Sequence, residues 1–243
     1  MSQCLVFPVR QAKITAGYKA KKYREKYGYD HYGVDMICVN DKYFDVYACG
    51  NGKVIAAGND GANSVGNIVV IRYNDVEVAD VGITDLICTY FHLQDGSICV
   101  KPGDYVNAAT KVGLYGKTGY GIVGEHLHIQ FDTDIYNPLY CTGIAGRGNI
   151  LKAGTVDSTV NPVKVLCNWD EAGKDREWRG EMVQWHDDYT NDEMSLWTDL
   201  RWTTPELDDL STKPNEPDEP IISPSGNKYK DAIEQIKAIV SNL

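Results

Sequence analysis

The feature that most constrains the fold is a series of short runs rich in β-branched and aromatic residues, separated by Gly, Asn and Asp, from about residue 5 to residue 167. Runs of this kind are typical of antiparallel strands. No long segment has helical periodicity, although Gln11–Tyr27 could hold a turn or two of helix or a long loop. The sequence therefore predicts a mainly β fold, an antiparallel β-sandwich or partly open barrel. The clearest strand candidates are Lys53–Ala57, Asn67–Tyr73, Asp85–His92, Lys111–Tyr115 and Leu127–Phe131.

The composition changes after Leu166, which predicts further segments outside the β domain. All five tryptophans lie between positions 169 and 202 among acidic residues, and prolines at 214, 217, 220 and 224 mark an extended linker. From Tyr229 to Leu243, apolar residues recur at alternating steps of four and three, which is a heptad seam. We predict a β domain over 1–168 with an insertion at about 133–160, an acidic Trp-rich extension over 169–210, a Pro-rich linker over 211–227 and an amphipathic helix over 228–243.

The negative charge of the chain is concentrated in its C-terminal part. Residues 181–220 hold twelve acidic and two basic side chains, which account for the whole net charge of −10. The β domain is therefore close to neutral, and no nucleic-acid partner is expected. The tryptophans could stack on sugar rings, although covering one flank of the domain is the favoured interpretation. The terminal helix is too short to be stable alone, so self-association is predicted, with docking onto another component or onto the protein's own barrel as the alternative.

The candidate chemistry depends on a few histidines. The chain has five, and four of them lie in three short motifs: His31-Tyr-Gly-Val-Asp35, Tyr90-Phe-His92-Leu93 and Gly124-Glu-His126-Leu-His128. Because side chains alternate along a strand, His126 and His128 should share one face while Leu127, Ile129 and Phe131 enter the core. Each motif alone fits a local hydrogen bond or an exposed pair as well as a metal site. The coincidence of all three in a histidine-poor chain favours a metal site.

These motifs, together with Ile14-Thr-Ala-Gly-Tyr18, Asp45–Gly58 and the glycine-rich stretch Val112–Gly119, resemble in order and spacing the lysostaphin/LytM-type zinc metallopeptidases. The resemblance covers roughly residues 6–167, and it implies the partly open barrel of that family, a duplicated hybrid motif. Two departures are the insertion near 133–160 and the differently composed stretch Tyr120–Gly124.

The resemblance implies a Zn²⁺ site formed by His31, Asp35 and His128, with His92 and His126 as the catalytic pair. Three protein ligands with the fourth position left to water are usual for catalytic zinc. Near the first ligand some members have a tyrosine, for which Tyr23, Tyr27 and Tyr29 are candidates, although packing roles are favoured. The resemblance further implies a peptidoglycan hydrolase, a metalloendopeptidase that cuts peptide cross-links in the bacterial cell wall.

The start of the sequence, MSQCLVFPVR, lacks the pattern of a secretory signal, and no apolar run reaches the ~20 residues of a membrane-spanning helix. We therefore expect a protein made in the cytoplasm without a signal peptide that acts at the cell wall, as a phage lysin or a virion-associated tail lysin. Two rival functions are a catalytically silent structural or regulatory wall-binding module of the same fold, and a phosphocarrier domain. The intact histidine set argues against the first, and the placement of Asp35 four residues after His31 suits a metal better than the second.

Overall fold

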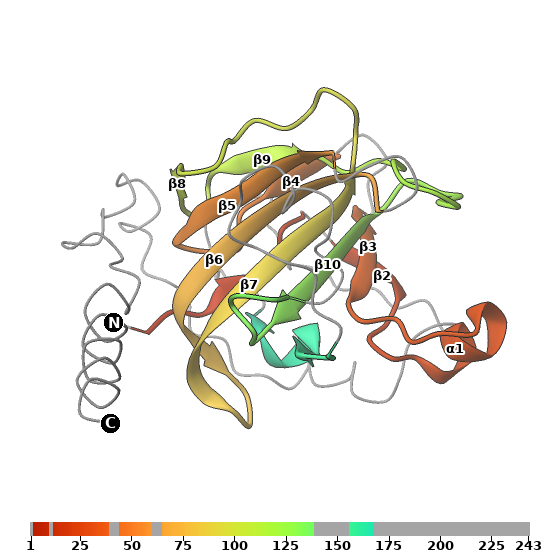
Figure 1. The fold of residues 1–243 in the computed structure, drawn as a ribbon, viewed down its shortest axis with the longest axis horizontal. Helices are drawn as coiled ribbons and strands as arrows, with labels where there is room; N and C mark the ends of the chain where they lie inside the picture. The colour runs from red at the N-terminus through yellow and green to blue at the C-terminus, as the bar shows by residue number, and fades with distance from the viewer. Residues whose placement is uncertain (1, 10–11, 39–43, 60–64, 139–155, 168–243) are drawn as a thin grey trace, which may run out of the picture.

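The computed structural model describes residues 2–9, 12–38, 44–59, 65–138 and 156–167 (Figure 1). Strands dominate these residues, which confirms the mainly β prediction. The predicted Trp-rich extension, linker and terminal helix lie outside the described residues, as does most of the predicted insertion. In chain order the elements are β1 (Leu5–Val6), β2 (Ala12–Ala16), α1 (Lys21–Tyr27), β3 (Val34–Cys38), β4 (Asp45–Tyr47), β5 (Gly52–Asn59), β6 (Asn67–Val78), β7 (Gly82–Leu93), β8 (Tyr105–Val106), β9 (Lys111–Leu114), β10 (Leu127–Asp132), β11 (Thr159–Val160), the 3-10 helix η2 (Pro162–Lys164) and β12 (Leu166–Cys167).

One large antiparallel sheet forms the body of the molecule. Its strands run in the order β2-β3-β10-β7-β6-β5-β8, and β11 adds to β10. Two small sheets accompany it, an antiparallel pair β4-β9 and a parallel pair β1-β12 (Figure 1). Because β2 and β8 end the large sheet without pairing to each other, the sheet is open and not a closed barrel.

The central strands are buried on both faces, and the side chains divide between two apolar clusters by simple alternation. On β6, Val69, Ile71 and Tyr73 enter the larger cluster, whereas Ile68 and Val70 enter the smaller one on the opposite face. The same division holds on β7. A central strand covered on both faces should read as a continuous apolar run, which is how Asn67–Tyr73 and Asp85–His92 appear in the sequence.

The stretch predicted as either a short helix or a loop contains both a strand and a helix. Ala12–Ala16 forms β2, which pairs with β3, and Lys21–Tyr27 forms the seven-residue helix α1. Gly28 ends α1 in the left-handed conformation, with φ of 83°, a position where a residue without Cβ is favoured. No residue of α1 is buried, so apolar periodicity could not have revealed this helix.

Candidate metal and catalytic site

The pairing of β3 with β10 brings two of the three predicted metal ligands together. In this antiparallel register Asp35 lies directly opposite His128, so their side chains share one face of the sheet. His31 lies in the loop between α1 and β3 and is almost fully buried. Residues 93 positions apart therefore meet at one point because strand register places them there.

Three potential ligand atoms form a compact triangle. His31 Nε2 lies 3.0 Å from Asp35 Oδ1 and 2.9 Å from His128 Nδ1. The third side, from His128 Nδ1 to Asp35 Oδ1, is 2.9 Å. Among the described residues, these three are the group of His, Cys, Asp or Glu side chains close enough to hold a metal ion together.

This donor set fits Zn²⁺. Zn–N and Zn–O bonds of about 2.0–2.2 Å in a tetrahedral arrangement place ligand atoms ~3.3 Å apart. The observed triangle needs to open by only a few tenths of an ångström. The set also combines two imidazoles with one carboxylate, a common composition for catalytic zinc.

A backbone contact fixes the orientation of the first imidazole. His31 Nδ1 lies 2.9 Å from the carbonyl oxygen of Gly17. Since a carbonyl can only accept, Nδ1 carries the hydrogen and Nε2 keeps its lone pair for the metal. Such a contact to the second ring nitrogen is usual for histidine ligands of metals.

Burial and neighbouring charges shift the pKa values of all three potential ligands. Burial would raise the pKa of Asp35, but the neighbouring charges of His31 and His126 and hydrogen bonds from His128 and His31 hold it well below its usual value. Burial would lower the pKa of His31, but the charge and hydrogen bond of Asp35 raise it above 6.5 in sum. Burial lowers the pKa of His128. Asp35 is therefore a charged ligand at neutral pH, and protons compete with a metal mainly at His31.

Gly33 is required where β3 approaches β10. A Cβ at this position would lie 2.3 Å from the carbonyl oxygen of Ile129 and 2.6 Å from His128 Nε2. No other residue type fits without moving the backbone or the His128 ring. The glycine within the His31–Asp35 motif is therefore part of the geometry of the site.

His92 reaches the site through a distortion at the end of β7. Phe91 pairs with His128, so plain alternation would turn His92 to the opposite face. Instead, His92 has a φ of 63° and the register between β6 and β7 shifts beside it. The side chains of Phe91 and His92 consequently line the same pocket, although they are neighbours along the strand. A non-glycine residue in this conformation carries backbone strain, which is often found at functional sites.

The two predicted catalytic imidazoles lie side by side with matching hydrogen bonds. Their ring centroids are 4.9 Å apart. His92 Nδ1 donates to the carbonyls of Val65 and Thr118, at 2.9 and 3.1 Å, and His126 Nδ1 donates to Gly124 at 2.9 Å. Each ring therefore keeps Nε2 for another partner. His126 Nε2 lies 3.6 Å from Asp35 Oδ1, and burial together with His126 and His128 lowers the pKa of His92 to about 3.

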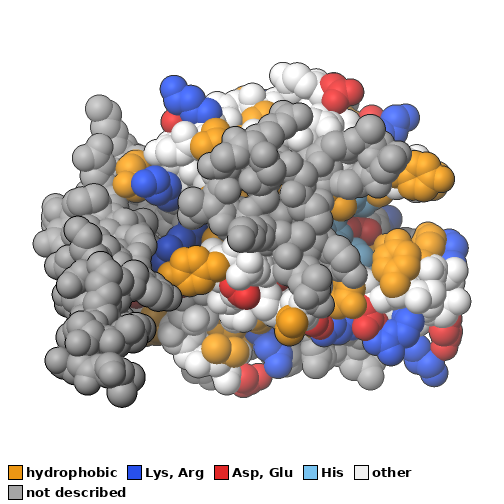
Figure 2. Space-filling view, viewed as in Figure 1, with side chains coloured by type: hydrophobic (Ala, Val, Ile, Leu, Met, Phe, Trp, Pro, Cys, Tyr) orange, Lys and Arg blue, Asp and Glu red, His pale blue; other side chains and the backbone are white. Residues whose placement is uncertain are grey.

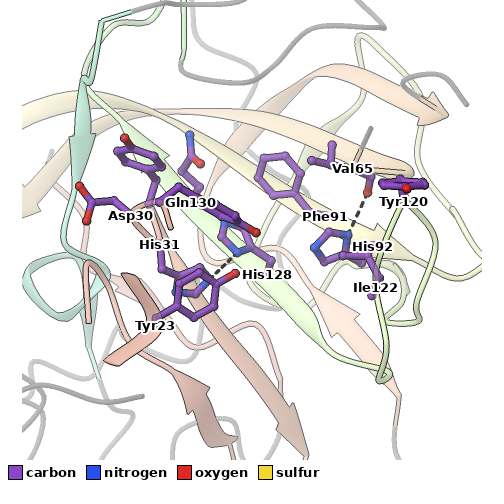
Figure 3. Close-up of a pocket in the computed structure, with 12 residues that line it drawn as sticks. Tyr23, Asp30, His31, Val65, Phe91, His92, Tyr120, Ile122, His128 and Gln130 are labelled. Carbon is purple, nitrogen blue, oxygen red and sulfur yellow. Dashed lines mark hydrogen bonds between the residues drawn. The ribbon is translucent and has the colours of Figure 1, made fainter. Parts of the chain in front are cut away.

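A pocket of about 410 Å³ opens over this cluster (Figures 2 and 3). In the surface view, the histidines lie in a hollow flanked by hydrophobic side chains (Figure 2). His92 lies with Val65, Tyr120 and Ile122 on one side of His128, whereas Asp30 and Gln130 lie on the other (Figure 3).

Sequence reasoning placed five residues at this site and missed several that line the pocket. Alternation from His128 would have indicated Gln130, but Tyr32, Val65, Tyr120 and Ile122 come from loops without a sequence signal. Of the candidate tyrosines, Tyr23 stacks on His31 with ring centroids 4.5 Å apart. Tyr29 lines the pocket, and Tyr27 packs on Tyr23.

Sequence similarity to known proteins identifies the family of this chain. The sequence model of peptidase family M23 matches residues 29–138. Lipoprotein NlpD of Yersinia enterocolitica is 30% identical over 94 residues, which are 39% of this chain and 84% of NlpD. The chain belongs to peptidase family M23. The resemblance to lysostaphin/LytM-type peptidases is thereby confirmed, and the matched region contains all five predicted site residues.

Solved structures with a similar fold include two peptidases. A zinc-containing peptidase from Vibrio cholerae is 29% identical, with a TM-score of 0.42, over 54% of this chain and 37% of that chain. The antimicrobial peptidase lysostaphin from Staphylococcus simulans is 22% identical, with a TM-score of 0.42, over 66% and 52%. The chain thus spans little more than a third of the Vibrio protein. These scores are modest, so the family assignment rests on the sequence matches.

The predicted localisation is wrong. NlpD is a lipoprotein, and so is a second curated relative that is 29% identical over 94 residues. These lipoprotein relatives contradict the expectation of a protein made in the cytoplasm without a signal peptide. The apolar residues near the start serve the fold, because β1 pairs with β12 and Leu5 is fully buried. Their pattern therefore carried no information about export. No helix in the described part of the chain has the length and apolar character needed to cross a membrane.

Proposed function

We propose that this protein is a zinc-dependent endopeptidase that hydrolyses peptide cross-links of bacterial peptidoglycan, with His31, Asp35 and His128 as zinc ligands and His92 and His126 as the catalytic pair. The observation that carries the proposal is the ligand triangle with sides of 2.9–3.0 Å, beside two further imidazoles. Membership of peptidase family M23 supports the reaction class.

Zinc bound by these residues would polarise the scissile carbonyl and lower the pKa of a water molecule to roughly 7. The protein supplies the proton acceptors. His92 and His126 each keep Nε2 available, because carbonyl groups engage their Nδ1 atoms. Burial lowers the pKa of His92 to about 3 and keeps that ring neutral at physiological pH, so its Nε2 can accept a hydrogen bond that orients the attacking water.

His126 is suited to the second proton transfer. Its ring is more exposed than that of His92, and its Nε2 faces the carboxylate of Asp35 at 3.6 Å. In its protonated form this imidazole can stabilise developing charge on the carbonyl oxygen and give a proton to the leaving amine. In this proposal the two histidines divide the tasks of orienting the water and protonating the leaving amine.

Metal analysis combined with the loss of turbidity of purified cell walls tests this proposal. We expect one zinc per chain and wall lysis by the wild type, little zinc in His128→Ala, and retained zinc without lysis in His126→Ala. Wild-type protein that binds zinc and leaves walls intact would support the alternative, a catalytically silent wall-binding module of the same fold. Absence of zinc binding would refute both the ligand set and the enzyme.

The phage lysin and tail-associated lysin interpretations rested on the expected lack of an export signal. Because the lipoprotein relatives contradict that expectation, the proposal is confined to the reaction. We also propose that residues 1–168 carry the chemistry, and that the segment 228–243 mediates self-association or docking onto a partner.

A further inference from the structure

The loop before α1 holds the first proposed zinc ligand at two points. The carbonyl of Gly17 accepts a hydrogen bond from His31 Nδ1 at 2.9 Å, and the amide nitrogen of Lys19 donates to the carbonyl of His31 at 2.6 Å. Residues 17–19 thus contact both the ring and the main chain of His31. Lys19 has a φ of 48°, a strained conformation for a non-glycine residue that persists only where surrounding contacts hold it.

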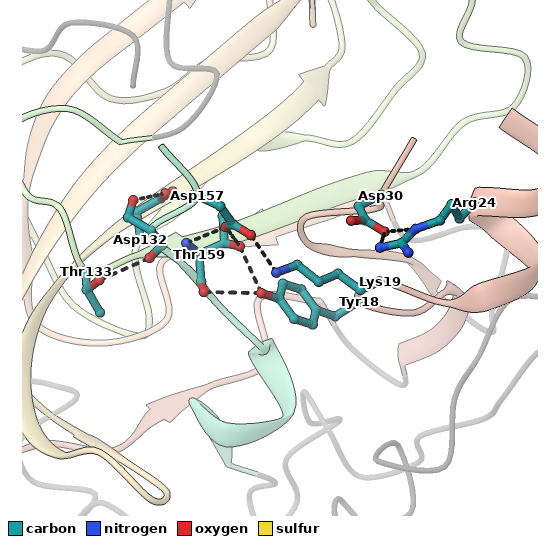
Figure 4. A network of polar contacts seen from close by, with 9 residues as sticks. Tyr18, Lys19, Arg24, Asp30, Asp132, Thr133, Asp157 and Thr159 are labelled. Atoms are coloured by element: carbon teal, nitrogen blue, oxygen red, sulfur yellow. Dashed lines mark hydrogen bonds and ion pairs between the residues drawn. The ribbon is translucent and has the colours of Figure 1, made fainter. Parts of the chain in front are cut away.

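The side chains of this loop are anchored to a segment far away along the chain (Figure 4). Tyr18 Oη lies 2.9 Å from Thr159 Oγ1, and Lys19 forms an ion pair with Asp157 at 2.5 Å. The partners are 141 and 138 positions apart. The two anchors form one unit, because the amide nitrogen of Thr159 donates to Asp157 Oδ1 at 3.0 Å.

The anchoring segment is in turn fixed to β10, the strand that carries His128. Within β11, Val160 pairs with Phe131 of β10. The amide nitrogen of Thr133 donates to the carbonyl of Ser158 at 2.9 Å, and Thr133 Oγ1 donates to the same carbonyl at 3.1 Å. The anchors therefore tie the loop that holds His31 to the strand that holds another proposed ligand.

We propose that Tyr18 and Lys19 are positioning residues for the zinc ligand His31, and that Asp157 and Thr159 hold them in place. This inference rests on the proposed function for the identity of the metal site. All four residues lie outside the stretch 29–138 that matches the family model. Residues 157 and 159 lie at the end of the predicted insertion at 133–160, so the part of the chain that departs from the family supports the metal site.

The size of the effect follows from how far these residues lie from the metal site. Loss of a residue in direct contact with a metal ligand typically lowers metal affinity by about 10- to 100-fold. The side chains of Tyr18 and Lys19 act one step further away, through the main chain of their loop. An ion pair between Arg24 and Asp30 also holds the residue before His31 independently (Figure 4). We therefore expect the lower end of the range, about tenfold.

The test removes both anchors in the double variant Tyr18→Phe with Lys19→Met, which keeps the size of both side chains. Competition with a chromophoric chelator measures zinc affinity, and the visible absorption of the Co²⁺-substituted protein reports the ligand geometry. We expect zinc affinity to fall about tenfold and the Co²⁺ spectrum to change. A wild-type zinc affinity would overturn the proposal. A weaker affinity with the wild-type spectrum would overturn it too, because it would indicate a general loss of stability.

Thr133→Val is the matched control. It removes one hydrogen bond to the anchoring segment and leaves residues 17–19, the backbone contact of Thr133 and the pairing of β11 intact. This variant should keep the zinc affinity and the Co²⁺ spectrum of the wild type. A loss of zinc affinity as large as in the double variant would show that any loosening of the segment has the same effect, and it would overturn the proposal.

Reversal of the ion pair tests the contact itself. Asp157→Lys places two positive charges together and should weaken zinc binding, whereas Asp157→Lys combined with Lys19→Asp should restore the affinity to within about threefold of the wild type. No recovery in the reversed pair would overturn the role of Lys19. Circular dichroism verifies the fold of every variant, and if the Tyr18 and Lys19 double variant does not fold, the reversed pair carries the test.

These measurements separate failure of this inference from failure of the proposed function, because zinc and Co²⁺ binding need no substrate. A wild type that binds zinc but leaves cell walls intact would refute the peptidase, and the zinc affinities of the variants would still decide the role of the anchors. A wild type that lyses walls while the double variant binds zinc as tightly would refute the anchors alone.

Discussion

Replacing Gly33 with alanine should disrupt zinc binding while leaving most of the fold intact. The added Cβ would lie 2.3 Å from the carbonyl oxygen of Ile129, about 1 Å inside the 3.4 Å at which ordinary contact begins. It would also press on His128 Nε2 at 2.6 Å. Metal–ligand distances tolerate deviations of only about 0.2 Å, so a shift of this size displaces a ligand.

The expected loss is about 100-fold in zinc affinity, the upper end for changes next to metal ligands, or about 2.7 kcal/mol. Competition with a chromophoric chelator measures the affinity, and circular dichroism verifies the fold. Gly124→Ala is the matched control, because its Cβ meets no atom within 4 Å and its φ is not positive. A folded Gly33→Ala protein that binds zinc within about threefold of the wild type would refute the reasoning.

Three further predictions follow from the site and the domain organisation. Zinc affinity should fall as the pH is lowered, and the fall should begin above pH 6.5, because the pKa of His31 is raised and its protonation competes with the metal. An unchanged zinc affinity between pH 8 and 6 in a chelator titration would contradict this prediction. In the zinc-free protein, the same raised pKa contributes stability that is full below pH 6.5 and lost as the pH rises through the raised value, which urea unfolding at several pH values would detect. A chain ending after residue 168 should keep its zinc and its wall-lytic activity. Loss of activity with retained zinc would show that the Trp-rich extension takes part in substrate binding. Sedimentation of the full chain and of the shortened chain tests self-association through 228–243.

Much of the sheet could be predicted because its central strands carry strong local signals. Asn67–Tyr73, Asp85–His92 and Leu127–Phe131 are dense in β-branched and aromatic residues, and all three lie within strands of the large sheet. The short strands β2 and β4 were missed. They are five and three residues long and contain Lys or Asp, so their pairing partners decide their structure more than their own composition does.

The site shows a similar division between local and long-range information. The order of the histidine motifs indicated which residues belong together, and the register of β3 against β10 supplies the reason, since it places Asp35 opposite His128. The turn of His92 into the pocket was not predictable by alternation, because it depends on a positive φ and a register shift that involves β6. The hydrogen bond between Ser158 and Asp132 joins residues 26 positions apart and could not be read from any local motif.

The central claim, zinc-dependent cleavage of cross-link peptides, is tested most directly by mass spectrometry of the fragments released from purified peptidoglycan. With zinc-loaded protein we expect new amino and carboxyl ends within the cross-link peptides, intact glycan strands, and no release by His128→Ala. New reducing ends in the glycan, or no released peptide from a wild-type protein with a full complement of zinc, would contradict the account.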